Sequence, residues 1–424
     1  MPGEQNEQLD GRQKPAGAPG ALSGLRVLDL SRVLAGPWSA QVLADLGADV
    51  IKVERPQRGD DTRSWGPPYI ADRDGRPTGE SAYFWACNRG KRSIAVDLAS
   101  PDGRGIVARL AAQSDILIEN YKVGTLERYG LDYKMLSAAN PRLVYCSITG
   151  FGHTGPYRSK PGYDTIAQAM GGLMSVTGYP DDAPGGGPLK AGVAVTDLMT
   201  ALYATVAILA ALNERTASGC GQHIDMSLLD VQVAGLANVG MNFLATGKLP
   251  DRMGNRLPTV YPSDAFRCAD GDLMLIVGND EQFQRMCRAI DLPDLAGDPR
   301  FATNEFRMRN AVTLAGIISA PLEKKPMAQW MARFEAAQVP HSPINNLAQV
   351  FGDPQVIARA MVVDLQHPAA GPVPTIANPI RMSRTAPAYQ RPPPMLGQHN
   401  REILQDLLGF SADECADLAS KGVI

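Results

Sequence analysis

The stretch from Leu25 to Glu54 constrains the fold most, because it reads as a strand, a helix and a second strand in succession. The run "LRVLDLS" predicts a buried strand, "SAQVLADLG" predicts a helix that closes at Gly47, and "DVIKVE" predicts the next strand. A strand–helix–strand unit of this kind is the start of a parallel sheet. The sequence therefore predicts a doubly wound α/β fold.

The same alternation continues along the chain, with strands predicted at "RSIAVDL", "DILIEN" and "LVYCSITG" and helical stretches such as "GRGIVARLAAQ" between them. Because 424 residues exceed one typical core, we expect two domains. We predict a Rossmann-like large α/β domain at 22–225, a smaller α+β domain at 226–340 and a C-terminal return to the large domain at 341–424. Residues 1–21 are polar and rich in Gly and Pro, which is typical of a disordered tail.

Composition argues against several classes of partner. A net charge of −3 gives no reason to expect nucleic acid, and the apolar stretch Ala201–Leu212 is about half of a bilayer span, so no membrane partner is expected. The six cysteines lack metal-like spacing, which favours no metal and a reducing cytoplasm. The absence of GxGxxG and GxxxxGK[ST] disfavours a simple dehydrogenase and a P-loop enzyme that uses ATP.

A single carboxylate, Asp197, lies where a small apolar run meets an apolar helix in "KAGVAVTDLMTALYATVAILAAL". It could cap the helix, because its oxygens can accept hydrogen bonds from free backbone N–H groups. It could instead be a nucleophile. The residues alone leave both interpretations open.

Basic and aromatic residues gather after the predicted strands. The turn at Gly36-Pro37 follows the first strand directly, at the edge where open α/β sheets bind ligands. Arg55, Arg58 and Arg63 follow the second strand, and a guanidinium suits phosphate oxygens, although each could be a solvated surface charge. Tyr121 closes a later strand, where it could support an adenine-sized ligand or be a structural aromatic.

Five stretches together resemble the class III CoA-transferase (CaiB/BaiF) family, in the family's order and from about Leu22 to the C-terminus. They are "RVLAGPWSAQVLADLGADVIKVERP", "NRGKRSIAVDL", "ENYKVGTLERYGLDY", "SITGFGHTGPYRSKPGYDTIAQAMGGLMSVTG" and "AGVAVTDLMTALYA". Within the family, "GDDTRSWGPP", "CSITGFGHTGP", "SPINNLAQVFGDPQV" and "RPPPMLGQH" most resemble the branch that exchanges CoA between succinyl-CoA and glutarate.

The resemblance implies a mechanism. The family's aspartate nucleophile falls on Asp197, whose carboxylate the helix start would keep ionised. It would form an acyl-aspartyl anhydride and then an aspartyl-CoA thioester, with acyl-CoA as co-substrate, a small carboxylic acid as acceptor, and neither ATP nor metal. By similarity the CoA-binding residues are Arg32, Val33, Leu34, Ala35, Arg55, Val96, Asn120, Tyr121, Arg128, Tyr129 and Lys160.

Further expectations concern the acceptor and assembly. The far carboxylate of a dicarboxylate needs a cation, for which Arg63, Arg252 and Arg256 are the candidates. The resemblance also implies an interlocked homodimer.

Two other functions remain open. An α-methylacyl-CoA racemase would share the fold and the aspartate, but it uses a histidine in a GHD motif, where this chain has Gly162-Tyr163-Asp164. Tyrosine is a poor base near neutrality, because its pKa is about 10. The other alternative is a protein that binds CoA without catalysis.

Overall fold

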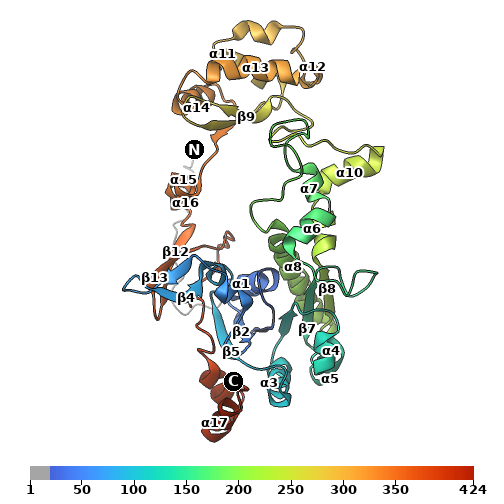
Figure 1. The fold of residues 1–424 in the computed structure, drawn as a ribbon, viewed down its shortest axis with the longest axis vertical. Coiled ribbons are helices and arrows are strands. Elements are labelled where there is room, and N and C mark those ends of the chain that lie inside the picture. Colours follow the sequence, from blue (N-terminus) through green and yellow to red (C-terminus); the bar gives the residue numbers. More distant parts are fainter. Residues whose placement is uncertain (1–19) are drawn as a thin grey trace, which may run out of the picture. The chain divides into compact units, whose positions relative to one another are not determined.

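The computed structural model of the protein describes residues 20–424 (Figure 1). Apart from its last two positions, the tail predicted at 1–21 lies outside the described residues. The described chain forms two compact units. The first comprises 20–173, 191–245 and 354–424, and the second comprises 174–190 and 246–353.

The first unit is built on a six-stranded sheet whose neighbouring strands all pair in parallel. Its strands, in spatial order, are β5 (Lys91–Ala95), β2 (Asp49–Glu54), β1 (Arg26–Asp29), β6 (Ile116–Glu119), β7 (Val144–Thr149) and β8 (His223–Ser227). The chain runs outward from β1 in both directions, as in a doubly wound Rossmann fold, so the order reverses between β1 and β6. The predicted parallel α/β architecture is confirmed.

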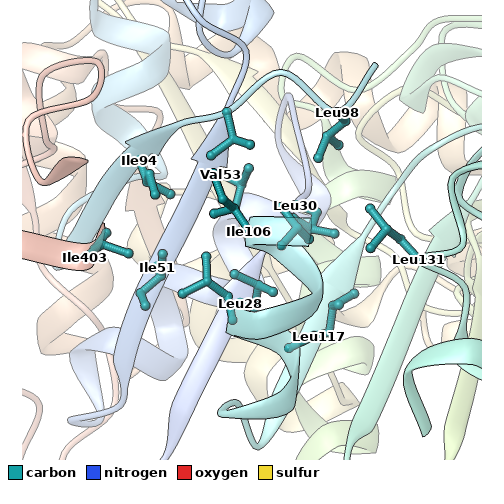
Figure 2. Close-up of a cluster of buried hydrophobic side chains, with 14 of the residues drawn as sticks. Leu28, Leu30, Ile51, Val53, Ile94, Leu98, Ile106, Leu117, Leu131 and Ile403 are labelled. Carbon is teal, nitrogen blue, oxygen red and sulfur yellow. The ribbon is translucent and has the colours of Figure 1, made fainter. Parts of the chain in front are cut away.

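Both faces of this sheet are covered, because successive strand residues point to opposite sides. On one face Leu28 and Leu117 join a core with α3 (Pro101–Ala112) and α5 (Tyr133–Ala139), part of which Figure 2 shows. On the other face Val27 and Val50 pack with α1 (Ala35–Asp45) and the long helix α8 (Val195–Ser218). The near-continuous apolar strand sequences follow from this two-sided burial.

Shorter elements complete the first unit. They are the hairpins β3 (Tyr69–Ala71) with β4 (Pro77–Ser81) and β12 (Val362–His367) with β13 (Gly371–Ile376), and the helices α2 (Ala82–Ala86), α4 (Thr125–Tyr129), α6 (Asp164–Met170), α9 (Leu228–Ala234), most of α10 (Ala237–Thr246), α16 (Pro354–Ala358) and α17 (Ala412–Ser420).

The second unit is an α+β fold with its own core. Its antiparallel sheet has the order β11 (His341–Pro343), β10 (Asp272–Ile276), β9 (Ser263–Arg267), and its main helices are α11 (Asp280–Ala289), α13 (Ala311–Leu322) and α14 (Met327–Ala336). Phe283, Trp330 and Phe334 are fully buried in its core.

The observed units differ from the expected boundaries in three places. Helix α9, expected in the small domain, packs against α6 and α8 and so belongs to the first unit. Residues 174–190 belong to the second unit, where the carbonyl of Gly178 accepts a hydrogen bond from the N–H of Gly254 at 2.9 Å. Residues 341–353 also belong there, because β11 completes its sheet.

The apolar helix α8 is longer than the stretch Ala201–Leu212 that the sequence predicts. It has 24 residues, so within the described chain it is long and apolar enough to cross a membrane, as is the bent pair α9 and α10 if taken as one span. One face of α8, including Ala204 and Ile208, is fully buried against the sheet. A core helix of this kind meets the same test of length and composition.

Candidate active site

Asp197 is the third residue of α8 and is only 9% exposed. Its backbone N–H donates to Asp164, whereas its side-chain oxygens accept no hydrogen bond from residues 20–424. The carboxylate is therefore buried but accepts no hydrogen bond within the described chain. Several other buried carboxylates of the unit, in contrast, form ion pairs.

The helix start is capped by a different residue. The N-cap position, Ala194, has no side-chain oxygen, and Asp164 of α6 takes its place. Its Oδ1 accepts hydrogen bonds from the N–H groups of Thr196 at 2.8 Å and Asp197 at 3.1 Å, while its Oδ2 accepts from Nε2 of Gln168 at 2.6 Å. The capping interpretation of the Asp197 side chain is thus wrong, because Asp164 provides the cap.

The electrostatics of Asp197 also differ from the expectation that the helix start keeps it ionised. Burial raises the pKa of its carboxyl, and the charge of Asp164 raises it further, from the ordinary 3.8 to about 7. Desolvation and like charge therefore outweigh the favourable helix terminus. Near neutral pH the side chain is therefore divided between its protonated and its ionised form.

Tyr83 of α2 is a neighbour of this carboxylate that sequence analysis missed. Burial, and then the charge of Asp197, raise the pKa of its hydroxyl, and Asp164 and Asp60 add to the effect. Its ring packs edge-on against Trp65 at 5.2 Å between centroids. Tyr83 is thus a neutral hydroxyl near both Asp197 and Asp60, and no sequence motif marks it.

A cavity lies at the carboxyl end of the sheet, where the strand order reverses. It is lined by Arg32, Lys52, Val53, Glu54, Arg55, Arg58, Gly59, Asp60, Asp61, Val96, Asp97, Leu98, Ala99, Tyr121 and Tyr129. Five of the predicted CoA-binding residues are among them: Arg32, Arg55, Val96, Tyr121 and Tyr129. Open α/β sheets bind ligands in such a crevice.

The segment after β1 is fixed to the segment after β6. The side chain of Asn120 accepts a hydrogen bond from the N–H of Arg32 at 2.8 Å and donates one to its carbonyl at 2.6 Å. The guanidinium of Arg32 lies 5.2 Å from the ring centre of Tyr121. Asn120 therefore holds the two edges of the crevice together rather than lining the cavity.

Two buried charges hold the backbone beside Arg32. Lys52 donates to the carbonyl of Ser31 at 2.9 Å and forms an ion pair with Asp60 at 2.9 Å, and both side chains are fully buried. Asp60 also accepts a hydrogen bond from the N–H of Val33 at 3.3 Å. Val33 has a φ of +71°, which costs a β-branched residue conformational energy. The sequence gives no sign of this backbone conformation.

The other predicted CoA-binding residues take different positions. Leu34 and Ala35 are buried at the start of α1. Arg128 lies on α4, and the ammonium of Lys160 lies 3.9 Å from the ring centre of Tyr157. None of these is part of the cavity wall.

The prediction that Arg63 binds the substrate carboxylate is wrong, because its side chain is already engaged. It donates to both oxygens of Glu54 at 2.7 and 2.8 Å, to Glu80 at 3.0 Å and to the carbonyl of Pro394 at 2.9 Å. Its guanidinium also lies 3.7 Å from the ring centre of Phe84. A buried arginine with its donors in use is a structural ion pair, so Arg63 is not available for a substrate carboxylate.

Arg252 and Arg256 both belong to the second unit. Arg252 donates to the carbonyls of Ser175 and Tyr179 and pairs with Asp181. The Nε atom of Arg256 is buried without a hydrogen-bond partner among the described residues, and its nearest carboxylate, that of Asp264, is 3.7 Å away. Of the two, Arg256 has more donor capacity left. Within residues 20–424, no group of three or more His, Cys, Asp or Glu could hold a metal ion.

Comparison with known proteins identifies the family of this chain. The family described as CoA-transferase family III matches residues 22–400, so the chain belongs to that family. It is 50% identical over 386 residues to the succinate–glutarate CoA-transferase of Agrobacterium fabrum, covering 91% of this chain and 95% of that protein. It is 41% identical to the succinyl-CoA:glutarate CoA-transferase of Homo sapiens, covering 95% and 90%.

A solved structure shows the same fold. The crystal structure of a CAIB/BAIF family protein from Brucella suis matches with a TM-score of 0.84 and 46% identity, covering 92% of this chain and 100% of that one. The predicted family is confirmed, and the chain is a family III CoA-transferase. The Agrobacterium and human relatives are both named as CoA-transferases, which weighs against the racemase and non-catalytic alternatives.

Proposed function

We propose that this enzyme transfers CoA from succinyl-CoA to glutarate through covalent intermediates on Asp197. The observation that carries the proposal is the state of Asp197: its carboxylate is buried, and it is free of hydrogen bonds from the described residues because Asp164 caps the helix. The substrate pair is taken from the names of the Agrobacterium and human relatives, which span nearly the whole chain.

The chemistry proceeds in four balanced steps. The Asp197 carboxylate attacks the thioester carbon of succinyl-CoA, which forms a mixed anhydride and releases CoA thiolate. The thiolate attacks the aspartyl carbonyl, which gives an aspartyl-CoA thioester and free succinate. Glutarate then attacks that thioester, which forms a second anhydride, between Asp197 and glutarate, and releases CoA thiolate. The thiolate attacks the glutaryl carbonyl, which gives glutaryl-CoA and restores the Asp197 carboxylate. One thioester replaces another, so the overall exchange is nearly balanced in energy and neither ATP nor a metal is required.

The mechanism needs Asp197 in its ionised form. Because burial and Asp164 raise the pKa of this group to about 7, the nucleophile is mostly protonated in mild acid and mostly ionised above neutrality. Activity is therefore expected to be lost as the pH falls below 7. The same burial excludes water, which would hydrolyse an anhydride or a thioester.

The cavity at the β1–β6 crevice would hold the nucleotide end of CoA. Arg32, Arg55 and Val96 line it together with the rings of Tyr121 and Tyr129, which provide flat apolar surfaces for an adenine. Asn120 and Val33 would act indirectly, because their hydrogen bonds fix the loop after β1. For the far carboxylate of glutarate, Arg252 and Arg256 remain the candidates. Of these, Arg256 makes only a long ion pair of 3.7 Å with Asp264, and its Nε has no hydrogen-bond partner among residues 20–424.

The interlocked homodimer remains part of the proposal. Helices of the first unit expose large apolar side chains, including Leu202 and Val206 of α8 and Met241 and Leu244 of α10. A second copy of the chain would cover this surface. We also propose a cytoplasmic location, which suits six cysteines that are all free thiols.

The test is the pair Asp197→Ala and Asp197→Asn. Both should lose transfer by at least about a thousandfold, because neither can form the anhydride, while both still bind CoA. Transfer is measured as glutaryl-CoA formed from succinyl-CoA and glutarate, and CoA binding by calorimetry. Normal turnover in either variant would refute the assignment. Activity with another acceptor but not glutarate would refute the substrate pair alone.

A further inference from the structure

Two of the cations that line the cavity form no ion pair with any of the described residues, 20–424. Most of its charged lining residues are paired: Lys52 with Asp60 at 2.9 Å, Arg32 with Asp61 at 3.1 Å, and Glu54 with the neighbouring Arg63 at 2.7 Å. Arg55 and Arg58 also line the cavity but form no ion pair or side-chain hydrogen bond with any of residues 20–424. The lining carboxylate that has no cation partner, Asp97, accepts a hydrogen bond from the N–H of Ala99.

Both arginines lie on one short turn with a fixed shape. The N–H of Gly59 donates to the carbonyl of Arg55 at 2.9 Å, and that of Arg58 donates to the carbonyl of Pro56 at 2.8 Å. Gln57 between them has a φ of +64°. The turn therefore closes on itself, with Arg55 at its start and Arg58 near its end.

The base of this turn is buried and ion-paired. A Cβ atom at Gly59 would lie 2.6 Å from Cδ of Arg63 and 2.8 Å from Oε2 of Glu54, so only glycine fits there. The next N–H, that of Asp60, donates to Oε2 of Glu54 at 3.0 Å. Arg63, which sequence analysis assigned to the substrate, instead anchors the turn. The two exposed guanidinium groups thus extend from a turn whose backbone is fixed by the buried Glu54 and Arg63.

Two unpaired guanidinium groups on a rigid turn suit an anion with several oxygens. The nucleotide end of CoA carries a 3′-phosphomonoester, close to two negative charges at neutral pH, and a 5′-diphosphate. The cavity also presents two tyrosine rings to the adenine of such a ligand, which would place its ribose and phosphates near the charged lining.

We propose that Arg58, together with Arg55, binds the 3′-phosphate of CoA and so makes the enzyme select CoA over dephospho-CoA. The proposal rests on the function proposed above and adds a selectivity residue to it. The Arg58 side chain is exposed and forms no ion pair or hydrogen bond with any of residues 20–424, so its replacement should leave the protein folded.

The experiment compares Arg58→Gln, Arg58→Lys and the wild type with succinyl-CoA and succinyl-dephospho-CoA at saturating glutarate. Wild-type KM should be about tenfold higher for the dephospho substrate, which lacks one charge-assisted contact. Arg58→Gln should raise KM for succinyl-CoA about tenfold and leave KM for succinyl-dephospho-CoA and both kcat values unchanged. Arg58→Lys should lie between the two. Arg401→Gln removes an exposed arginine that bonds only to Gln405, and it serves as the matched control.

Equal increases in both KM values would mean that Arg58 acts on the diphosphate or on the loop, and would overturn the proposal, as would no change in either. Binding of adenosine 3′,5′-bisphosphate and adenosine 5′-monophosphate, measured by calorimetry, separates this inference from the proposed function. The wild type should prefer the bisphosphate about tenfold and Arg58→Gln should not. That preference can hold or fail whether or not glutarate is the acceptor.

Discussion

Replacing Asp164 by Asn should move the acidic limb of the pH–rate profile to lower pH. In the wild type the charge of Asp164 is the second cause, after burial, of the raised pKa of Asp197. Asparagine removes that charge but keeps an oxygen for the N–H groups of Thr196 and Asp197, so the helix cap is retained. The substitution therefore separates the electrostatic role of Asp164 from its capping role.

The magnitude follows from the causes of the pKa. The full displacement runs from 3.8 to about 7, and Asp164 is responsible for the smaller share, so less than half of it can be lost. The pKa of Asp197 in the variant should thus fall below about 7 but stay above the ordinary value, because burial, the larger cause, remains. Because the nucleophile is the ionised form, activity should persist about one pH unit further into acid.

The assay is kcat/KM for succinyl-CoA from pH 5 to 9, which reports the pKa of the free enzyme. Asp164→Ala is the matched control, because it removes both the charge and the cap. It should show a similar displacement of the limb together with a loss of about 1 kcal/mol in the free energy of unfolding. A limb that stays at about pH 7 in Asp164→Asn, or moves to higher pH, would refute the assignment of the limb to Asp197.

Two further predictions concern the loops around the cavity. Arg63→Ala should lower the free energy of unfolding by about 3–5 kcal/mol in denaturant titrations, because it leaves Glu54 buried without its partner; a stable variant with a raised KM for glutarate would restore Arg63 as a substrate residue. Val33→Gly should raise the free energy of unfolding by up to about 1 kcal/mol, because glycine adopts a positive φ without the cost that valine bears. A less stable Val33→Gly protein would show that the valine side chain contributes more than its backbone conformation costs.

The fold was largely predictable because its signals are local. The apolar runs and the helix between them appear in consecutive residues, and the parallel sheet follows from that alternation. The unit boundaries were not predictable in the same way. Residues 174–190 join the second unit through a hydrogen bond to Gly254, more than 70 positions further along the chain.

In the candidate site, too, local features were predictable and long-range contacts were not. Asp197 is marked by its place at a helix start, and the cavity residues Arg32, Arg55 and Tyr121 follow strand ends. Asp164 as the helix cap escapes sequence analysis because it acts on residues more than 30 positions away.

Arg55 and Arg63 show most clearly what the sequence alone could not predict. Both follow β2 and look alike in the sequence, yet Arg55 lines the cavity while Arg63 is buried against Glu54 and Glu80. Only tertiary contacts distinguish an arginine that lines a cavity from one that is buried in an ion pair.

Isotope transfer to Asp197 tests the central mechanism most directly. In the proposed steps an oxygen of the glutarate carboxylate becomes the bridging oxygen of the second anhydride, and it stays on the aspartate when the thiolate takes the glutaryl group. Turnover with succinyl-CoA and [18O]glutarate should therefore place 18O in the side chain of Asp197, detectable by mass spectrometry of its peptide. Glutaryl-CoA formed with no label in that peptide would contradict the covalent role of Asp197.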